Sequence, residues 1–546
     1  MKNTYAALKK KDENPDIRWI LAISFLLFCA ELAYGIYLGL VEEKLPADSI
    51  SRVANAYYVF AVNPHRLSSI GFVWNPLPSW MELPVVAFAP LWKPLVSKGI
   101  ASCFVTALFA ALSVGYLLFT FTRFGIAKPP ALVCSLLYAF HPYVFYYGAN
   151  GMSEAMFMFF LIYCVCNLTL WMRDGGDPSL IRMAFGLAGG FLVRYETIPF
   201  ALGLGVCIVL TILCDPGQNR FWESGGAGSK KKERYYYAES SLIMLYTPLA
   251  YTILMWICVC WMITGNPLYF LNSNYSNTAQ SSMAVRVGSV RELAQYVLLR
   301  ATPFLTVFLA IVLVRLFQKR LLRSDFFCLL FLVMSLLVFH TLMYWHGSSF
   351  GWLRFFCYSL PVCFAWLPFE LSAYEKEKEQ SRSYRLRVAT AKRHYLRERP
   401  LSGGTRSLLV LLPVAVLASF LLLSRAMGGS SIADYDGSSH GQENEIVSYI
   451  NTHLPDQVIL TDVFTTYYVA VNVDHFDRLV ISSDLNFQKC VADPAGNGIE
   501  YLLVPDPKKV NFDSVDNTYP DLYEHGADWC TEEMDFGGFK LFKVTG

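Results

Sequence analysis

The sequence predicts an all-α, multi-spanning membrane protein that ends in a small extracytoplasmic α/β domain. Hydrophobic residues make up 54% of the chain, above the roughly 45–50% that is usual in soluble domains. Apolar stretches of about 20 residues, long enough to cross a bilayer as a helix, recur from Trp19 to Ser424. Residues 430–546 then carry 6 Lys and Arg against 20 Asp and Glu, a balance of −14, which leaves +16 on the remainder of a chain whose net charge is +2. The apolar part is therefore a membrane domain and the acidic part a polar one.

The membrane domain contains about 11 predicted spans, and basic residues gather in alternate connections, as expected of cytoplasmic loops. The cytoplasmic tail, residues 1–18, holds five Lys and Arg, and the odd span count places the C-terminus outside. The spans are residues 19–40, 101–122, 130–148, 152–171, 183–193, 197–214, 240–263, 300–318, 325–344, 355–372 and 407–424. The predicted domains are a membrane domain (19–428) with a long outer loop (41–100) and a basic cytoplasmic loop (373–406), a flexible linker (429–442) and the outer domain (443–546).

Several features limit the class of protein. Glu31 and the lack of a small-residue cleavage site make the first span a retained anchor. Apolar spans flank the basic runs at 230–234 and 376–406, which favours a topological role over nucleic-acid binding. Twelve of 14 cysteines lie in or beside apolar spans, without metal-site spacing, so no metal site is predicted. The other two, Cys490 and Cys530, predict a disulfide in an oxidising compartment.

The outer domain has the pattern of a small α/β fold. Glu443–His453 has a helical pattern, and three short apolar runs, Val458–Asp462, Leu479–Ser482 and Tyr501–Val504, predict buried parallel strands. No Gly-x-Gly-x-x-Gly turn follows any of these strands, so we expect a structural or acceptor-recognition role and no nucleotide site.

The long outer loop contains residue types suited to sugar-phosphate chemistry. A carboxylate such as Asp48 can take a proton from an acceptor hydroxyl, and an arginine such as Arg52 can bind a phosphate bidentately. The two residues are four apart, which puts them on one face of a helix. The same spacing also suits an ordinary surface ion pair, so both interpretations stay open.

At this point the sequence resembles the GT-C superfamily of membrane glycosyltransferases over residues 15–370, in the branch of the protein O-mannosyltransferases and the lipid A aminoarabinose transferases. Three segments carry the resemblance: Pro46-Ala-Asp48-Ser-Ile-Ser-Arg52, then Asn150-Gly-Met-Ser-Glu154 after His141-Pro142, and Leu192-Val-Arg194-Tyr-Glu196. The chain departs from many relatives at Ser49, where they have a second acid. It departs again at Trp74-Asn-Pro-Leu-Pro78, where some have a Lys-Pro element that supplies a phosphate-binding lysine.

The resemblance and the residue types together imply roles for ten residues. Asp48 would be the base for the acceptor hydroxyl, Glu154 a second acid that orients the acceptor or the site, and Arg52, Arg194 and Arg354 the phosphate-binding candidates. Candidates for substrate contact are Trp74, Asn75, Glu196, Tyr269 and His346. Structural alternatives remain for three positions: Arg194 and Glu196 can pair to hold a helix break, and His346 can be a hydrogen-bonded interface residue. The aromatic loop around Tyr269 is also typical of an interfacial aromatic belt.

The predicted function is transfer of a sugar from a polyprenyl-phosphate donor to a protein, lipid or surface-glycan acceptor at the outer face of a cell membrane. The membrane lipids deliver the donor, and no cofactor is expected beyond a weakly bound divalent cation. Two rivals remain: a transporter or flippase for a lipid-linked sugar, and a non-catalytic scaffold, which a wide separation of Asp48 from Glu154 would favour.

Overall fold

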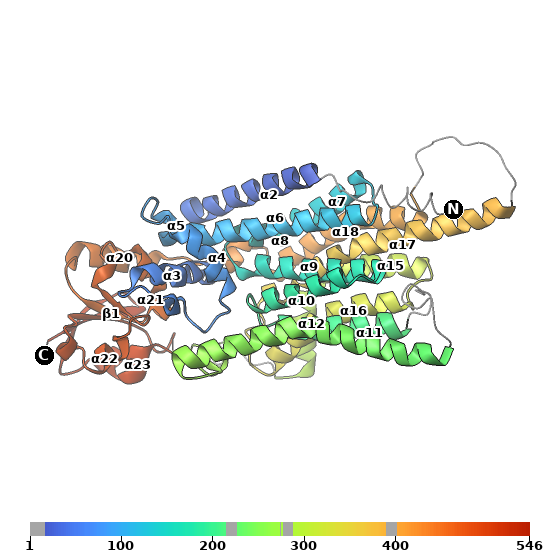
Figure 1. The fold of residues 1–546 in the computed structure, drawn as a ribbon. Coiled ribbons are helices and arrows are strands. Elements are labelled where there is room, and N and C mark those ends of the chain that lie inside the picture. The colour runs from blue at the N-terminus through green and yellow to red at the C-terminus, as the bar shows by residue number, and fades with distance from the viewer. Residues whose placement is uncertain are drawn as a thin grey trace.

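A computed structural model of the protein describes residues 17–214, 227–273, 275–276, 288–388, 401–510 and 512–545. The molecule is elongated, with long helices side by side along its main axis and the C-terminal domain at one end (Figure 1). Most of the predicted tail 1–18 and much of the basic loop 373–406 lie outside the described residues.

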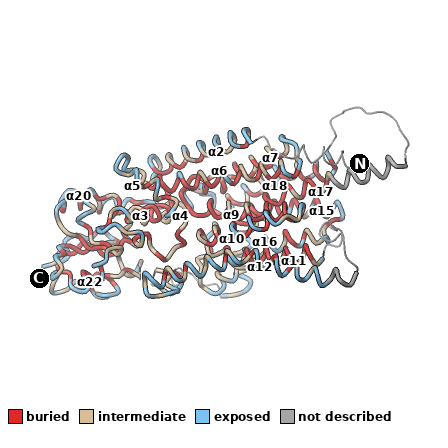
Figure 2. The backbone as a smooth tube through the Cα atoms, in the orientation of Figure 1, coloured by how far each residue is buried: buried red, intermediate tan, exposed pale blue. Residues whose placement is uncertain are grey.

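Within the described residues, nine helices are long and apolar enough to cross a membrane. Their bounds are α2 Ile17–Tyr37, α6 Ile100–Arg123, α9 Ser153–Asp174, α11 Thr197–Cys214, α12 Ala227–Thr264, α15 Val290–Phe317, α16 Ser324–Trp345, α17 Ser359–Val388 and α18 Gly403–Ala426. The spans of α9 and α17 are mostly buried, whereas those of α2 and α12 keep most of their apolar side chains on the surface (Figure 2). Such an outward apolar surface is what a lipid environment requires.

The remaining two predicted spans are shorter helices. Residues 130–148 are divided into α7, Lys128–Ala139, and α8, Pro142–Ala149. The division falls at His141-Pro142, where the proline ring clashes with the preceding residue and disfavours a helical conformation there. The span predicted at 183–193 is the end of α10, Asp177–Phe191, whose 15 residues extend about 22 Å against a hydrocarbon core of about 30 Å.

The long loop 41–100 is folded into short elements against the C-terminal domain. A π-helical turn, η1 Leu38–Glu42, ends α2, and the loop continues as α3 Ala47–Ala61, η2 Leu67–Ile70, α4 Leu77–Val86 and α5 Pro94–Ser97. Two further short elements follow α12 and α16, namely α13 Tyr269–Asn272 and η4 Leu353–Phe356.

The C-terminal domain contains a five-stranded sheet of order β2-β1-β3-β5-β4. The predicted strands are β1 Ile459–Thr461, β2 Leu479–Ile481 and β3 Tyr501–Pro505, and their parallel pairing is confirmed. Antiparallel β4 Cys530–Asp535 and β5 Phe539–Val544 were not predicted. The helical elements are α20 Gly441–His453, α21 Val463–Asn472, η5 Phe476–Arg478, α22 Phe487–Ala492, η6 Ala495–Asn497, α23 Ser514–Thr518 and α24 Leu522–His525.

Two expectations for this region were wrong. The segment predicted as a flexible linker, 429–442, contains a short helix, α19 Ile432–Asp436, capped by the Ser431 side chain and packed against the membrane domain. Cys490 and Cys530 are both free thiols. Each is buried in a hydrophobic core of the C-terminal domain, where cysteine packs as a small apolar residue.

Candidate active site

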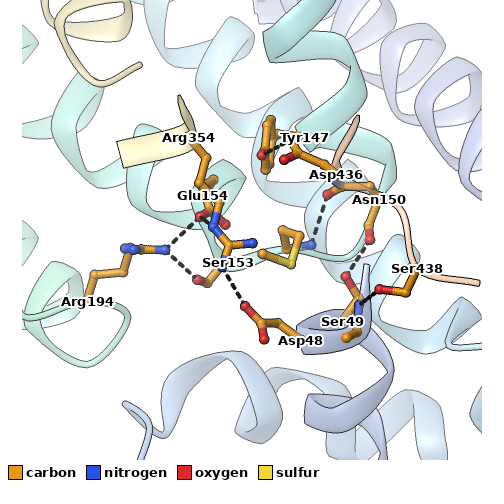
Figure 3. A network of polar contacts seen from close by, with 12 residues as sticks. Asp48, Ser49, Tyr147, Asn150, Ser153, Glu154, Arg194, Arg354, Asp436 and Ser438 are labelled. Atoms are coloured by element: carbon orange, nitrogen blue, oxygen red, sulfur yellow. Dashed lines mark hydrogen bonds and ion pairs between the residues drawn. The ribbon is translucent and has the colours of Figure 1, made fainter. Parts of the chain in front are cut away.

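Four charged side chains from distant parts of the sequence meet at the end of the bundle that contacts the C-terminal domain. Asp48 lies in the first turn of α3, and Glu154 lies in the first turn of α9. Arg194 follows α10, and Arg354 belongs to η4. Their side chains point toward one another (Figure 3), and we call these four residues the charged cluster. The structure therefore brings Asp48 and Glu154 into one network. A wide separation of the two acids, which would have favoured a non-catalytic scaffold, is not found.

Glu154 is the centre of the charged cluster. Its side chain is fully buried, and its Oε1 accepts a hydrogen bond of 2.9 Å from Arg194 Nη1. The Nε of Arg354 lies 3.5 Å from the same oxygen. A buried carboxylate is costly unless it is paired, and two guanidinium groups meet that requirement here.

Arg354 also joins the cluster to Asp48. Its Nη2 donates to Asp48 Oδ2 at 2.9 Å, and about a third of the Asp48 side chain remains exposed, at 32%. The helical spacing of Asp48 and Arg52 therefore does not produce an ion pair between them. The Arg52 guanidinium is instead buried over the ring of Trp74, 4.7 Å from its centroid.

Arg194 and Glu196 have both of the roles considered from the sequence. Arg194 Nη2 lies 2.8 Å from Glu196 Oε1, a pair that holds the turn between α10 and α11. The same Arg194 also donates from Nη1 to Glu154 and to Ser153 Oγ, at 3.2 Å for the latter. The helix break thus fixes one guanidinium inside the charged cluster.

The turn before α9 positions Glu154. Gly151 has a φ of +80°, and a Cβ there would lie 2.0 Å from Ser102 Oγ, so only glycine fits this turn. The Asn150 side chain accepts from the Met152 amide, and the Asn150 carbonyl accepts from Ser49 Oγ at 2.7 Å. The start of α9 is therefore tied to α3 one residue away from Asp48.

The charged cluster borders a cavity of about 400 Å³, which we call the first cavity. Its lining combines charges with apolar side chains of α11 and α16. The residues that matter here are Asp48, Arg52, Trp74, Asn75, Ser153, Arg194, Glu196, Ile198, Pro199, Phe339, His340, Met343, Trp352, Arg354 and Phe355. Polar groups on one side of an apolar pocket are what an amphiphilic ligand requires.

Two predicted substrate contacts lie elsewhere. Tyr269 does not line the first cavity but a neighbouring cavity of about 390 Å³, which we call the second cavity. His346 lines neither of them; it is exposed at the end of α16, near the Ser348 hydroxyl. His340, six residues earlier on the same helix, lines the first cavity instead.

Three polar residues of the site were missed. His340 Nε2 lies 4.0 Å from Glu196 Oε1. Glu82, on α4, is fully buried close to Arg52, and burial raises the pKa of its carboxyl well above the usual range. Asp436, in the supposed linker, accepts a hydrogen bond from the Tyr147 hydroxyl; burial raises its pKa, while Tyr147 and the charge of Arg354 act in the opposite direction. Only Glu82 carried a signal, as an acid inside an apolar run.

No family model matches the sequence, and no curated protein matches it either. Among the described residues there is no cluster of three or more His, Cys, Asp or Glu side chains that could hold a metal ion. The crystal structure of ArnT from Cupriavidus metallidurans in the apo state is similar, with a TM-score of 0.51, 13% sequence identity, and coverage of 95% of this chain and 97% of that one. The structure of the same protein bound to undecaprenyl phosphate gives 0.49, with the same identity and coverage. The likeness to the apo structure covers nearly the whole chain, beyond the residues 15–370 of the sequence resemblance, and the chain therefore has the fold of ArnT.

Proposed function

We propose that this chain is a membrane glycosyltransferase that takes a sugar from a polyprenyl-phosphate donor and transfers it to an acceptor on the side of the membrane where the C-terminal domain lies. One observation carries the proposal. A single guanidinium, that of Arg354, joins a partly exposed carboxylate, Asp48, to a buried one, Glu154, at the wall of a partly apolar cavity.

That arrangement allows the donor phosphate to replace the Asp48 carboxylate as a partner of Arg354. Glu154 is buried and holds both Arg194 and Arg354, so it stays in place. Asp48 is more exposed and holds Arg354 alone. A donor phosphate entering the first cavity competes for Arg354, because a phosphate accepts the same bidentate hydrogen bonds as a carboxylate. Binding of the donor thereby releases Asp48 to act as a base.

The proposed transfer then follows from the charges. Asp48 takes the proton of the acceptor hydroxyl as the acceptor oxygen forms a bond to the anomeric carbon of the sugar. The bond from that carbon to the phosphate oxygen breaks, and polyprenyl phosphate leaves with the electron pair. Arg354 and Arg194 stabilise the negative charge that grows on the leaving phosphate. Two arginines supply this charge, so we expect the reaction to need no divalent cation.

The membrane delivers the donor in this proposal. Ile198, Phe339 and Met343 give the first cavity an apolar side, formed by membrane helices α11 and α16. An isoprenoid chain gains roughly 0.8 kcal/mol for each buried methylene-sized group, so the protein itself has to recognise only the phosphate and the sugar.

The same side is proposed to be extracytoplasmic. Basic residues occupy the last turns of α6 and α9, at Arg123 and Arg173, and the connection that follows α15, at Lys319 and Arg323. These helix ends point away from the C-terminal domain in Figure 1. Positively charged connections stay in the cytoplasm, which supports an external C-terminal domain.

A transporter of lipid-linked sugars is the rival. Transporter sites lie near the middle of the bilayer, at broken helices. All four residues of the charged cluster instead lie at the start of a helix or in a connection at one end of the bundle. This placement favours chemistry at the membrane surface over passage through the bundle.

Reconstitution with defined donors tests the proposal. The purified chain is placed in proteoliposomes with polyprenyl phosphates carrying mannose, glucose, galactose or aminoarabinose, in the presence of a chelator, and release of polyprenyl phosphate is measured. Arg354→Ala should abolish release, whereas Arg478→Ala, an exposed arginine of the C-terminal domain, should not change it. Consumption of nucleotide sugars with lipid-linked sugars inert, or movement of intact donor without release, would overturn the proposal.

A further inference from the structure

We infer that the second cavity binds the acceptor and that it recognises an uncharged, hydroxyl-rich group, that is, a carbohydrate. The assignment as an acceptor site rests on the proposed function, whereas carbohydrate binding by this cavity does not. The cavity has a volume of about 390 Å³. It lies between three parts of the chain: α3 with the loop that follows it, the segment around Thr264 and Tyr269 with Tyr275, and the C-terminal domain.

Apart from Arg66 and Asp484, the polar side chains that line the second cavity are amides and hydroxyls. Asn55 comes from α3, Ser68 from η2 and Thr264 from the end of α12, while the C-terminal domain contributes Ser482 and Gln488. Such groups both donate and accept hydrogen bonds, as the hydroxyls of a sugar do. Nothing in this set selects for a charged ligand.

The two charged residues of the lining, Arg66 and Asp484, carry opposite charges. Arg66 donates to the carbonyl of Ser483 and, at 3.1 Å, to Ser69 Oγ. It also acts on Asp484, where its charge lowers a carboxyl pKa that burial raises. The lining of the second cavity therefore has no net charge, whereas the lining of the first has three arginines against two acids, Asp48 and Glu196.

Aromatic rings supply the remaining walls. Tyr275 stacks on Phe464 of α21 with 4.6 Å between ring centroids, and Trp74 lies 6.3 Å from the same Phe464 ring. Phe72 stacks on Trp256 at 5.7 Å. Flat apolar faces beside amides suit the C–H faces and the hydroxyl edges of a pyranose ring, the same combination of apolar walls and a few placed polar groups that small-molecule pockets use.

One face of α3 connects the second cavity with the proposed base. Asp48 and Arg52 line the first cavity, and Ser51 and Asn55 line the second. Ser51, Arg52 and Asn55 follow Asp48 by three, four and seven residues, which places all four side chains on one side of the helix, over about 10 Å of its axis. Trp74 and Asn75 line both cavities and form their common wall. A sugar held by Asn55 can thus present a hydroxyl past Trp74 toward Asp48.

The test measures carbohydrate binding and donor-side binding separately, on the full chain in nanodiscs. Saturation-transfer NMR with methyl glycosides of neutral hexoses and N-acetylhexosamines reports the second cavity. Undecaprenyl phosphate, titrated by quenching of tryptophan fluorescence, reports the first. We expect Asn55→Ala combined with Gln488→Ala to weaken glycoside binding by roughly fivefold or more through the loss of two hydrogen bonds, with undecaprenyl phosphate binding unchanged. Gln318→Ala, an exposed residue at the opposite end of the bundle, is the matched control and should bind glycosides as the wild type does.

Further arms separate the outcomes. Gln488 lies at the exposed rim, so Gln488→Ala alone keeps the test informative if the double variant fails to fold. A glucosyl diacylglycerol in the nanodisc competes with methyl glucoside if the source is a lipid headgroup and leaves its binding intact if the source is a free glycan. Absence of any glycoside binding, equal binding by the double variant, or preferential binding of a Ser- and Thr-containing peptide would overturn the inference. Glycoside binding by a wild type that does not bind undecaprenyl phosphate would refute the proposed donor and leave the carbohydrate site standing.

Discussion

Replacing Asp48 by Asn should separate catalysis from stability. The amide keeps the shape of the side chain and can still accept a hydrogen bond from Arg354, but it cannot take a proton. The ion pair that is lost is partly exposed, and pairs of this kind contribute about 0.2–1 kcal/mol to folding. A general base contributes about 10²–10⁴ in rate, which corresponds to roughly 2.7–5.4 kcal/mol of activation free energy. The effect on turnover should therefore exceed the effect on stability several times.

The assay follows release of polyprenyl phosphate by the purified variant, together with its thermal unfolding. We expect kcat to fall by about 10²–10⁴. The donor KM should stay the same or decrease, because loss of the Asp48 charge leaves Arg354 freer to meet the phosphate. Asp477→Asn, an exposed acid of the C-terminal domain, serves as the control. Wild-type turnover by a folded Asp48→Asn protein would refute the assignment of the base.

Three further outcomes are expected. Gly151→Ala should lower the unfolding temperature and the activity far more than Gly125→Ala. Both glycines have positive φ, so either substitution costs about 1–2 kcal/mol of folding free energy, but only the new Cβ at residue 151 would collide with a side chain. Equal losses of stability in the two variants would contradict this account. Burial raises the pKa of Asp516 to about 7. The folded state therefore keeps a proton that the unfolded state loses between about pH 4 and 7, and the free energy of unfolding falls as the pH rises through that range. Asp516→Asn should therefore raise the unfolding temperature at pH 8 and leave it nearly unchanged at pH 4, and a flat difference across pH would count against the burial effect. Reporter tags after Tyr235 and after Pro520 should read as cytoplasmic and external, respectively, and a cytoplasmic tag after Pro520 would show that a span was miscounted.

The membrane fold was predictable because apolar length is a local property. A run of about 20 apolar residues needs no partner to be recognised. The span divided at His141-Pro142 and the short α10 are less clearly predicted by apolar length, since their ends depend on neighbouring helices. The missed strand β4 has the sequence Cys-Thr-Glu-Glu-Met-Asp and lies at the edge of the sheet, mostly exposed. An edge strand with polar side chains lacks the apolar pattern by which β1, β2 and β3 were recognised.

The site was predictable residue by residue but not as a network. Asp48, Glu154, Arg194 and Arg354 stand out because charges at the ends of membrane spans are costly without a function or a partner. Their pairing is a tertiary property: Asp48 and Arg354 are 306 positions apart, and the four-residue spacing that suggested Arg52 as the partner of Asp48 is not used. Tyr269 and His346 show the same limit, because aromatic and histidine side chains in a loop do not reveal which cavity they face.

The segment predicted as a linker gives the C-terminal domain a direct connection to the proposed base. The first amide of α3, that of Ala47, donates to Ser438 Oγ at 3.0 Å, which satisfies an N–H that would otherwise lack a partner. Asp48 follows immediately, at the helix N-terminus, where a negative charge is favoured. In the same segment Asp434 pairs with Lys44 at 2.7 Å, and Asp436 binds Tyr147 beside the charged cluster. A movement of the C-terminal domain that pulls on residues 434–438 would therefore displace the start of α3 and Asp48 with it, so the domain proposed to contact the acceptor is also placed to set the position of the base.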